Sequence, residues 1–268
     1  TLGSLLTVTL DLVERPTRTA LVLLQFDDLV KAMEATNAIL EVNPSAIELM
    51  DRMLIGLTRT QPGYASQIEF IHGDPAGLLA VEFYGSSDAE LQAKCDACVA
   101  HVTKRGISLM TDAQVLMDPK KQAQVWNVRK AGLGLLMSVR GDAKPIPVIE
   151  DVSVPVEHLP EYVSTVQKMV DRYGTSAAFY AHASSGCLHV RPLINLKTVE
   201  GVEAMREMAH EAAELAARFG GYMSGEHGDG LQRSELNEKI FGTEIYEKMR
   251  EFKAIFDPNG LMNPGKIV

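Results

Sequence analysis

The sequence predicts an α+β fold made of two ferredoxin-like halves, in which an antiparallel sheet is covered by helices. Two observations predict it. Strand-like apolar runs and segments with helical periodicity follow each other in a similar order in both halves of the chain, and no low-complexity linker separates the halves. A chain of 268 residues with 46% hydrophobic and 23% charged residues is also large enough to bury a substantial core.

The first half is expected to follow the order strand, helix, strand-like run, strand, helix. Aspartates at 27 and 28 and Ser87 are suitable helix N-caps, and the Asn-Pro-Ser sequence at 43–45 ends the first helix. The predicted elements are strands at 7–13 and 17–26, a helix at 27–42, an apolar segment at 46–57 that fits either element, a strand at 77–84 and a helix at 87–104.

The second half is expected to repeat this pattern. Two glycines at 220–221 end its clearest helix, and the Asp-Pro-Asn-Gly sequence at 257–260 stops the last one. The predicted elements are a helix at 118–137, a loop at 140–149, a strand at 149–154, a helix at 158–173, a broken strand at 177–193, and helices at 199–219 and 244–256.

Charge and cysteine usage exclude several classes of protein. A net charge of -9 and a pI near 5.3 argue against nucleic acid as a main partner. No apolar run approaches a membrane span, and no signal peptide is visible. The three cysteines form no disulfide framework, and Cys95 and Cys98 have the spacing of core-facing helix residues. We therefore expect a cytoplasmic protein, at most peripheral to the inner face of the membrane.

Two histidines, a glutamate and a third histidine form the strongest chemical signal in the chain. His182 and His189 lie seven residues apart, and Glu226 and His227 are adjacent between glycines. Two imidazoles and a carboxylate suit a borderline divalent cation with one coordination position left for substrate. Since neighbouring side chains cannot easily aim at one metal, we expect one of the last two residues to bind it and the other to face the substrate. The alternative is that these are ordinary strand residues and a solvated turn.

The spacing of seven excludes a regular element between the two histidines. On a helix they would lie about 10.5 Å apart along the axis, too far for two nitrogens that bind one metal at about 2.0–2.1 Å. On an unbroken strand, an odd offset sends the side chains to opposite faces. We expect the chain to bend at 183–186, where Gly186 can adopt a positive φ. Cys187 is expected to pack rather than to reach the metal.

Two motifs carry a resemblance to a known family. The tail Phe-Asp-Pro-Asn-Gly-Leu-Met-Asn-Pro-Gly-Lys at 256–266 and the Ser-Gly-Glu-His-Gly sequence at 224–228 resemble the C-terminal domain of FAD-linked oxidases. These are the glycolate oxidase, D-lactate dehydrogenase and D-2-hydroxyglutarate dehydrogenase relatives of the vanillyl-alcohol oxidase superfamily. The segments 144–151 and 188–192 are most similar to the large bacterial branch, in which an iron–sulfur region follows the flavin part.

The resemblance implies a domain division and a set of cofactors. Residues 1–16 would be the end of a FAD-binding domain that lies outside this sequence, and residues 17–268 the substrate-binding cap domain. FAD would be bound mainly by that N-terminal domain of the same polypeptide, and an iron–sulfur cluster would lie elsewhere in the parent chain. The family's divalent metal, zinc or manganese, would be held by His182, His189 and Glu226.

The resemblance also assigns roles to four further residues. His227 is similar to the proton-accepting histidine, and Arg129, in a Trp-x-x-Arg motif, to the arginine that clamps the substrate carboxylate. Lys144 lies where some relatives carry a substrate-contacting lysine, and Asn263 belongs to a segment that returns to the flavin domain. The alternatives from the residues alone are that Arg129 is an exposed helix arginine and that Asn263 belongs to a plain C-terminal turn.

Together these roles imply oxidation of a small D-2-hydroxy acid of the lactate, glycolate or 2-hydroxyglutarate type. Leu133 stands where hydroxyglutarate-specific relatives have a threonine, so the sequence does not select among these substrates. Without its flavin partner the isolated fragment is expected to be inactive. The alternative function is a non-catalytic cap that binds metal or mediates assembly in a multidomain protein.

Overall fold

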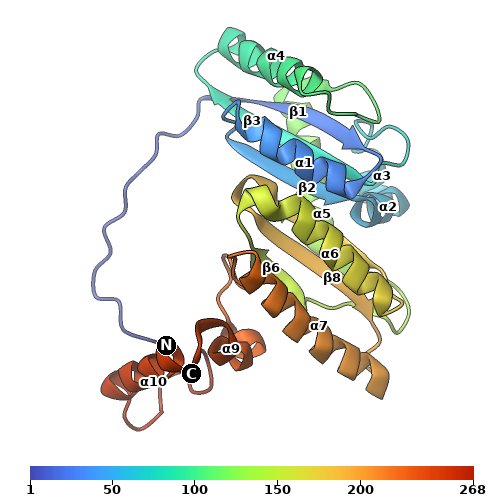
Figure 1. Cartoon of the computed structure of the whole chain (residues 1–268). Coiled ribbons are helices and arrows are strands. Elements are labelled where there is room, and N and C mark those ends of the chain that lie inside the picture. The colour runs from blue at the N-terminus through green and yellow to red at the C-terminus, as the bar shows by residue number, and fades with distance from the viewer.

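One eight-stranded sheet runs through the protein in the computed structural model, which describes residues 1–268 (Figure 1). Neighbouring strands follow the order β4-β1-β3-β2-β7-β8-β5, and β6 pairs with β8. The strands are β1 (Arg18–Phe26), β2 (Ala46–Asp51), β3 (Gly77–Gly85), β4 (Gln114–Leu116), β5 (Lys144–Pro145), β6 (Ile149–Ser153), β7 (Ala177–His182) and β8 (Cys187–Ile194). The longer helices are α1 (Leu29–Leu40), α2 (Arg52–Thr60), α4 (Asp88–Lys104), α5 (Pro119–Met137), α6 (Leu159–Arg172), α7 (Val199–Arg218) and α10 (Thr243–Phe256). Short helices are α3 (Pro62–Ala65), α8 (Gly230–Arg233) and α9 (Asn237–Phe241).

The first half has the ferredoxin-like connection pattern. Its main elements follow the chain order β1, α1, β2, β3, α4, β4, and its strands lie side by side in the order β4-β1-β3-β2. All of these strand pairs are antiparallel. The α2 and α3 helices are inserted between β2 and β3.

The second half repeats the pattern without a full fourth strand. The chain order β6, α6, β7, β8, α7 places the strands in the order β7-β8-β6. After α7, Tyr222 forms an isolated antiparallel bridge with Ser153, where a fourth strand would pair. The two halves join where Glu48 of β2 lies opposite His182 of β7. The predicted α+β fold with an antiparallel, helix-covered sheet is therefore confirmed.

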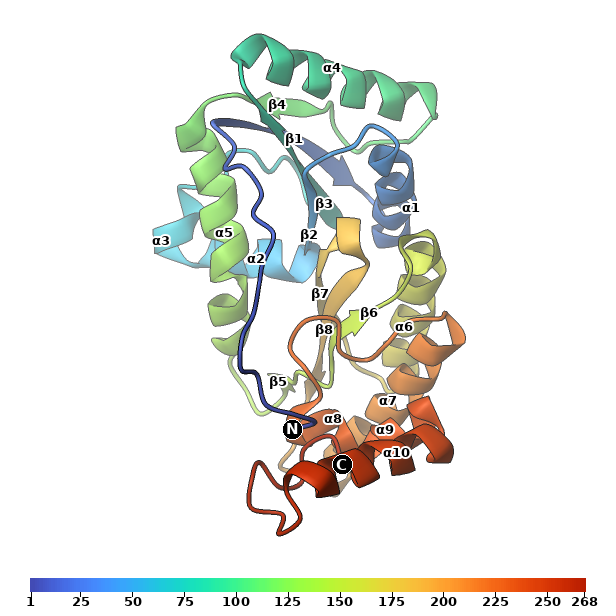
Figure 2. The same ribbon diagram turned by 90° about the vertical axis from the view of Figure 1, so that its left-hand side faces the viewer.

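The two faces of the sheet are covered differently. The α1, α4, α6 and α7 helices pack on one face around a core of 36 buried residues that runs through both halves (Figure 1). On the other face, α2 and α5 cover a smaller cluster of 13 residues that belongs to the first half (Figure 2). Cys95 and Cys98 belong to the large core, and burial raises their pKa values to about 11 and about 12. Their predicted packing role is thereby confirmed.

The prediction of a strand at 7–13 is wrong. This segment has no regular structure and pairs with no neighbour, and Leu12 and Val13 are both 93% exposed. Its apolar composition suggested a strand, but no sheet edge lies beside it to accept its backbone hydrogen bonds. The ambiguous segment 46–57 contains both elements, because the Asp51 side chain accepts the Leu54 N–H at 2.9 Å and caps α2 directly after β2.

No helix of the protein combines the length and the apolar composition that crossing a membrane requires.

Candidate functional site

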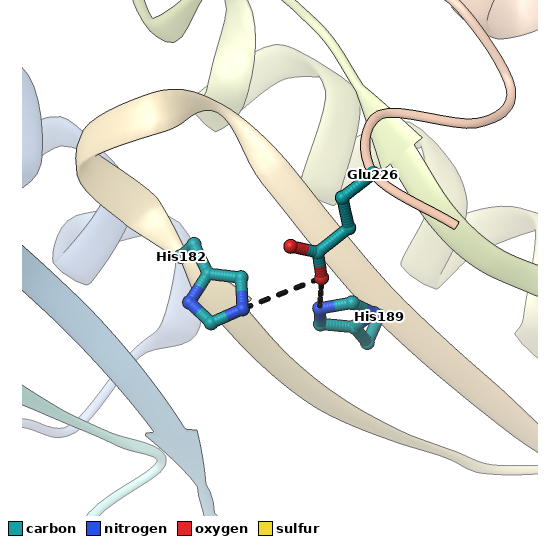
Figure 3. A group of neighbouring side chains, drawn as sticks. All are labelled: His182, His189 and Glu226. Carbon is teal, nitrogen blue, oxygen red and sulfur yellow. Dashed lines mark ion pairs between the residues drawn. The ribbon is translucent and has the colours of Figure 1, made fainter. Parts of the chain in front are cut away.

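The predicted metal ligands converge on the sheet face opposite the large core. His182 ends β7, His189 lies on β8, and Glu226 comes from the loop after α7 (Figure 3). Glu226 Oε1 lies 3.5 Å from His182 Nε2 and 3.4 Å from His189 Nε2. The structure therefore brings together, from three separate segments, the three residues that the sequence singled out.

A reversal of the chain places both histidines on the same face. The 3-10 turn Ala183–Ser185 and Gly186, with a φ of 71°, connect β7 to β8. A Cβ atom at position 186 would collide with the carbonyl oxygen of Val154, so the turn requires glycine there. In the hairpin, His189 lies opposite Tyr180, two residues from His182, and the two imidazole centroids are 5.4 Å apart. The expected bend between the two histidines is confirmed.

Each of the two imidazoles is held from behind by a carboxylate. Glu48 Oε1 lies 2.7 Å from His182 Nδ1, and Glu150 Oε1 lies 3.3 Å from His189 Nδ1. The hydrogen bond to Glu48 raises the pKa of His182 above its ordinary value. Because both Nδ1 atoms face these carboxylates, both Nε2 atoms are free to face Glu226. A carboxylate behind an imidazole is the usual arrangement that orients a metal-binding histidine.

A buried polar network surrounds His189. Glu150 Oε1 accepts hydrogen bonds from Arg191 at 2.8 Å and from the Tyr180 hydroxyl at 3.2 Å, and the Tyr180 ring stacks on His189 with centroids 4.7 Å apart. Burial opposes ionisation of Glu150, but the nearby His189 imidazole and the Arg191 guanidinium hold its pKa below the ordinary value. Burial and the Glu150 charge raise the pKa of Tyr180 to about 12. The network therefore fixes the His189 ring with an ionised carboxylate behind it.

The fourth predicted residue, His227, lies beside the three ligand candidates. Its Nε2 is 3.4 Å from Glu226 Oε1, and its ring centroid is 5.5 Å from that of His189. The imidazole is 49% exposed, so a small molecule can reach it. The backbone N–H of His227 donates to Asp151 Oδ2 at 2.8 Å. Burial tends to raise the pKa of Asp151, but the hydrogen bonds that its carboxylate accepts from this loop hold that pKa below its ordinary value.

Arg129 reaches the same cluster from α5. Its Nε donates to Glu48 Oε2 at 3.1 Å, its Nη2 lies 2.9 Å from the same oxygen, and its guanidinium carbon lies 5.1 Å from the centre of the Tyr180 ring. Glu48 therefore contacts both Arg129 and His182. The Nε–Nη2 edge of the guanidinium is occupied, and Nη1 makes no hydrogen bond within the protein.

The distances among the three ligand candidates fit a divalent cation. At 3.4–3.5 Å, the two Nε2···Oε1 separations exceed those of ordinary hydrogen bonds. Two ligands of a tetrahedral ion with bonds of about 2.1 Å lie about 3.4 Å apart. One ligand atom of each residue lies within 4.8 Å of the others. Two neutral imidazoles and one carboxylate form a donor set suited to zinc and to manganese.

Comparison with known proteins shows the family of the chain. The family model for FAD linked oxidases, C-terminal domain, matches residues 15–267. The chain belongs to this family.

Curated relatives of this FAD-linked oxidase C-terminal domain include several dehydrogenases and oxidases. The chain is 32% identical to D-2-hydroxyglutarate dehydrogenase of Pseudomonas putida over 276 residues, covering 99% of this chain and 27% of the relative. It is 28% identical to glycolate oxidase subunit GlcD of Escherichia coli, covering 99% of this chain and 51% of that protein. The chain thus spans about a quarter to a half of the curated relatives it matches.

Solved structures share the fold. The chain superposes on p-cresol methylhydroxylase with a TM-score of 0.66 at 13% identity, covering 94% of this chain and 53% of the other. It superposes on 4-ethylphenol oxidase from Gulosibacter chungangensis with a TM-score of 0.60 at 15% identity, covering 94% and 54%. At such identities the comparison shows the fold alone.

The structure of this FAD-linked oxidase domain does not bring Lys144 into the cluster. Lys144 lies on β5 opposite Ile194, and its Nζ donates to the Val139 carbonyl at 2.6 Å. Ile194 is five residues beyond His189 along β8, a separation of about 16 Å in a strand.

Asn263 also lies outside the cluster. It is near the chain termini, which lie close together, and its Nδ2 donates to Thr1 Oγ1 at 2.8 Å (Figure 2).

Sequence reasoning missed the three carboxylates behind the site. Glu48, Glu150 and Asp151 lie on β2 and β6, and none of them was assigned a role. The signal was present in part, because Glu48 interrupts an apolar run in β2, and Glu150 and Asp151 stand between Ile149 and Val152 in β6. Charged residues are seldom fully buried unless they have partners, so such interruptions indicate buried polar contacts.

Proposed function

We propose that this domain binds the substrate and a divalent metal, zinc or manganese, in a flavin-dependent D-2-hydroxy acid dehydrogenase. The observation that carries the proposal is the convergence of His182 Nε2 and His189 Nε2 on Glu226 Oε1, with a carboxylate behind each imidazole. The names of the relatives support a 2-hydroxy acid of the 2-hydroxyglutarate, glycolate or lactate type as the substrate.

The remainder of the enzyme is assigned to other parts of the polypeptide. In this proposal residues 17–268 form the substrate cap, and residues 1–16 are the end of the FAD-binding domain, toward which Asn263 lies. The matched region is about a quarter of the hydroxyglutarate dehydrogenases. The remaining length of such a protein has room for both a flavin domain and an iron–sulfur region. We assign the transfer of electrons away from the reduced flavin to the iron–sulfur region.

The reaction removes a proton and a hydride from the substrate alcohol. A divalent cation, when bound, would be held by His182, His189 and Glu226 and would lower the pKa of a 2-hydroxyl group, and the flavin would supply the hydride acceptor. His227 receives the hydroxyl proton at Nε2, the ring nitrogen that faces Glu226, and the product is the 2-oxo acid. An imidazole is well matched to this task because it changes charge near neutral pH.

Arg129 holds the substrate carboxylate in this proposal. Glu48 occupies its Nε–Nη2 edge, so Nη1 is the atom offered to the substrate. Glu48 also orients His182, and thus a single carboxylate fixes both the substrate clamp and one metal ligand. Lys144 lies outside the cluster and would contact the substrate carboxylate only after a movement of β5. We therefore assign it a smaller contribution to substrate binding than Arg129.

Metal analysis and a substrate screen of the intact protein test the proposal. After loading with zinc or manganese, we expect one ion per chain in the wild type and none in His182→Ala. Flavin reduction is then followed with the D-enantiomers of lactate, malate and 2-hydroxyglutarate, and with glycolate. Absence of metal after either loading contradicts the metal site. Stoichiometric metal without oxidation of any 2-hydroxy acid favours a non-catalytic metal-binding or assembly cap instead.

A further inference from the structure

Asp151 lies at an irregular position of β6, directly behind the candidate site. The register of β6 against β8 shifts between Glu150 and Val152, and Asp151 has a φ of 70°. Its side chain is fully buried. Left-handed backbone is uncommon for residues other than glycine, and bulges of this kind redirect a side chain. Here the bulge turns the Asp151 carboxylate toward the loop after α7.

Every residue of the loop 224–227 bonds to Asp151. Its Oδ1 accepts the N–H of Glu226 at 2.9 Å, and its Oδ2 accepts the N–H of His227 at 2.8 Å. Oδ2 also accepts the hydroxyl of Ser224 at 2.8 Å, and the backbone carbonyl accepts the N–H of Gly225 at 2.6 Å. One residue of β6 therefore organises the whole loop.

Nothing else fixes the backbone of Glu226 and His227 by hydrogen bonds. Neither residue makes a backbone–backbone hydrogen bond, and both N–H groups donate to Asp151 alone. The loop also lies close against β6, since a Cβ atom at Gly225 would lie 2.9 Å from Ser153 Cβ. A change in the Asp151 carboxylate is thus transmitted directly to the two residues that face the imidazoles.

Asp151 could also be read as a metal ligand, because its carboxylate groups with Cys187 and Glu226. Both of its oxygens, however, already accept N–H or O–H donors. Burial raises the pKa of Cys187 to about 12, so its thiol is a poor metal donor near neutral pH. The contacts therefore make Asp151 a hydrogen-bond acceptor for the loop.

We propose that Asp151 is a positioning residue that sets the Glu226 carboxylate and the His227 imidazole against His182 and His189. Two adjacent side chains cannot be aimed independently, so the backbone between them must be held in one conformation. The carboxylate supplies this by binding both N–H groups at once. The consequence for metal binding and proton transfer rests on the proposed function, whereas the organisation of the loop does not.

Hydrogen exchange of the intact protein tests the loop directly. Asp151→Asn keeps the size of the side chain and tolerates a positive φ, but offers one acceptor oxygen in place of two. We expect the amides of residues 222–229 to exchange about tenfold faster, the effect of one lost hydrogen bond. Exchange of β1 serves as the internal control and should not change. Equal exchange of residues 222–229 in the variant and the wild type would overturn the proposal.

Cobalt binding provides a readout that a merely structural role would not change. Co²⁺ titration of Asp151→Asn should give a dissociation constant about 10–100-fold higher, as for other residues that support metal ligands. The visible absorption spectrum of the Co²⁺ bound to Asp151→Asn should also differ from that of the wild type, because the Glu226 carboxylate is displaced in the variant. The matched control Ser224→Ala removes only one contact of Oδ2, and should show a smaller shift. A wild-type spectrum and affinity in Asp151→Asn would overturn the positioning role.

The two proposals fail in different ways. If the wild type binds no Co²⁺, the proposed metal site is wrong, and hydrogen exchange still decides the role of Asp151. If Asp151→Asn does not fold, hydrogen exchange of the wild type replaces it. Protected amides of Glu226 and His227, whose only acceptor is Asp151, then support the proposal, and unprotected amides overturn it.

Discussion

The two halves of the protein share a topology, but the same face of the sheet has a different use in each. In the first half, the face opposite the large core carries apolar side chains such as Leu21, Leu23 and Leu78, which pack under α2 and α5. In the second half the corresponding face carries His189, Arg191 and other polar groups that contact one another. The two halves thus share their backbone pairing, while the side chains on this face of the sheet decide whether it becomes part of the core or a candidate active site.

Loss of the proposed base, His227, should have the largest effect on activity. His227→Ala is expected to lower kcat of the intact protein by about 10²–10⁴-fold, the usual contribution of a general base. Its metal content should equal that of the wild type, because His227 is not among the three ligand candidates. Steady-state kinetics and metal analysis check both points. Near-wild-type oxidation of all the 2-hydroxy acids would contradict the assignment.

A core substitution in the first half should change stability and leave the site intact. Leu23→Ala removes a side chain that is 1% exposed, and is expected to lower the free energy of unfolding by about 2–5 kcal/mol. Urea denaturation measures the change, and Co²⁺ affinity serves as the control. A weakened metal site in this folded variant would show that the halves are more tightly coupled than their separate uses suggest.

Glu48 tests the boundary between the two halves. It belongs to the first half by sequence, but contacts His182 and Arg129. We expect Glu48→Gln to weaken metal binding about 10–100-fold, because it removes the carboxylate behind His182. KM for the 2-hydroxy acid should also rise, because Arg129 loses its partner. The nearby Glu82→Gln is the matched control on β3, and an equal effect of the two substitutions would argue against a specific role of Glu48.

Asp51 should affect stability rather than the site, by making stability depend on pH. Its carboxylate joins the halves by accepting the N–H of Leu54 at 2.9 Å and that of Phe179 at 2.8 Å. Burial raises its pKa from 3.8 to about 7. The folded state therefore binds the proton more tightly than the unfolded state, so stability decreases as pH rises from about 4 to about 7 and is constant above.

Urea denaturation at pH 5 and pH 8 measures this dependence. The wild type should lose roughly 3 kcal/mol more than Asp51→Asn between the two values. Identical pH profiles for the two proteins would show that the Asp51 carboxylate does not titrate in this range.

Local patterns were sufficient for most helices and strands and for the ligand candidates. The capping residues Asp28 and Ser87 begin α1 and α4 as expected, and the odd spacing of His182 and His189 required the bend that the structure contains. The apolar run at 7–13 was wrongly predicted to be a strand. A strand needs a neighbouring strand to pair with, and such neighbours come from distant parts of the chain. Lys144 was assigned by its resemblance to a lysine of some relatives, which says little about its distance from the site in space.

By itself, the sequence determined the α+β pattern and the chemical set of two imidazoles, a carboxylate and a neighbouring third imidazole. Periodicity and local spacing express these features, because they depend on residues a few positions apart. Only the tertiary structure decided what stands behind them: Glu48 behind His182, Glu150 behind His189, and Asp151 behind Glu226 and His227. These pairs lie 134, 39, 75 and 76 residues apart, and strand pairing and a bulge, which local composition does not encode, bring them into contact.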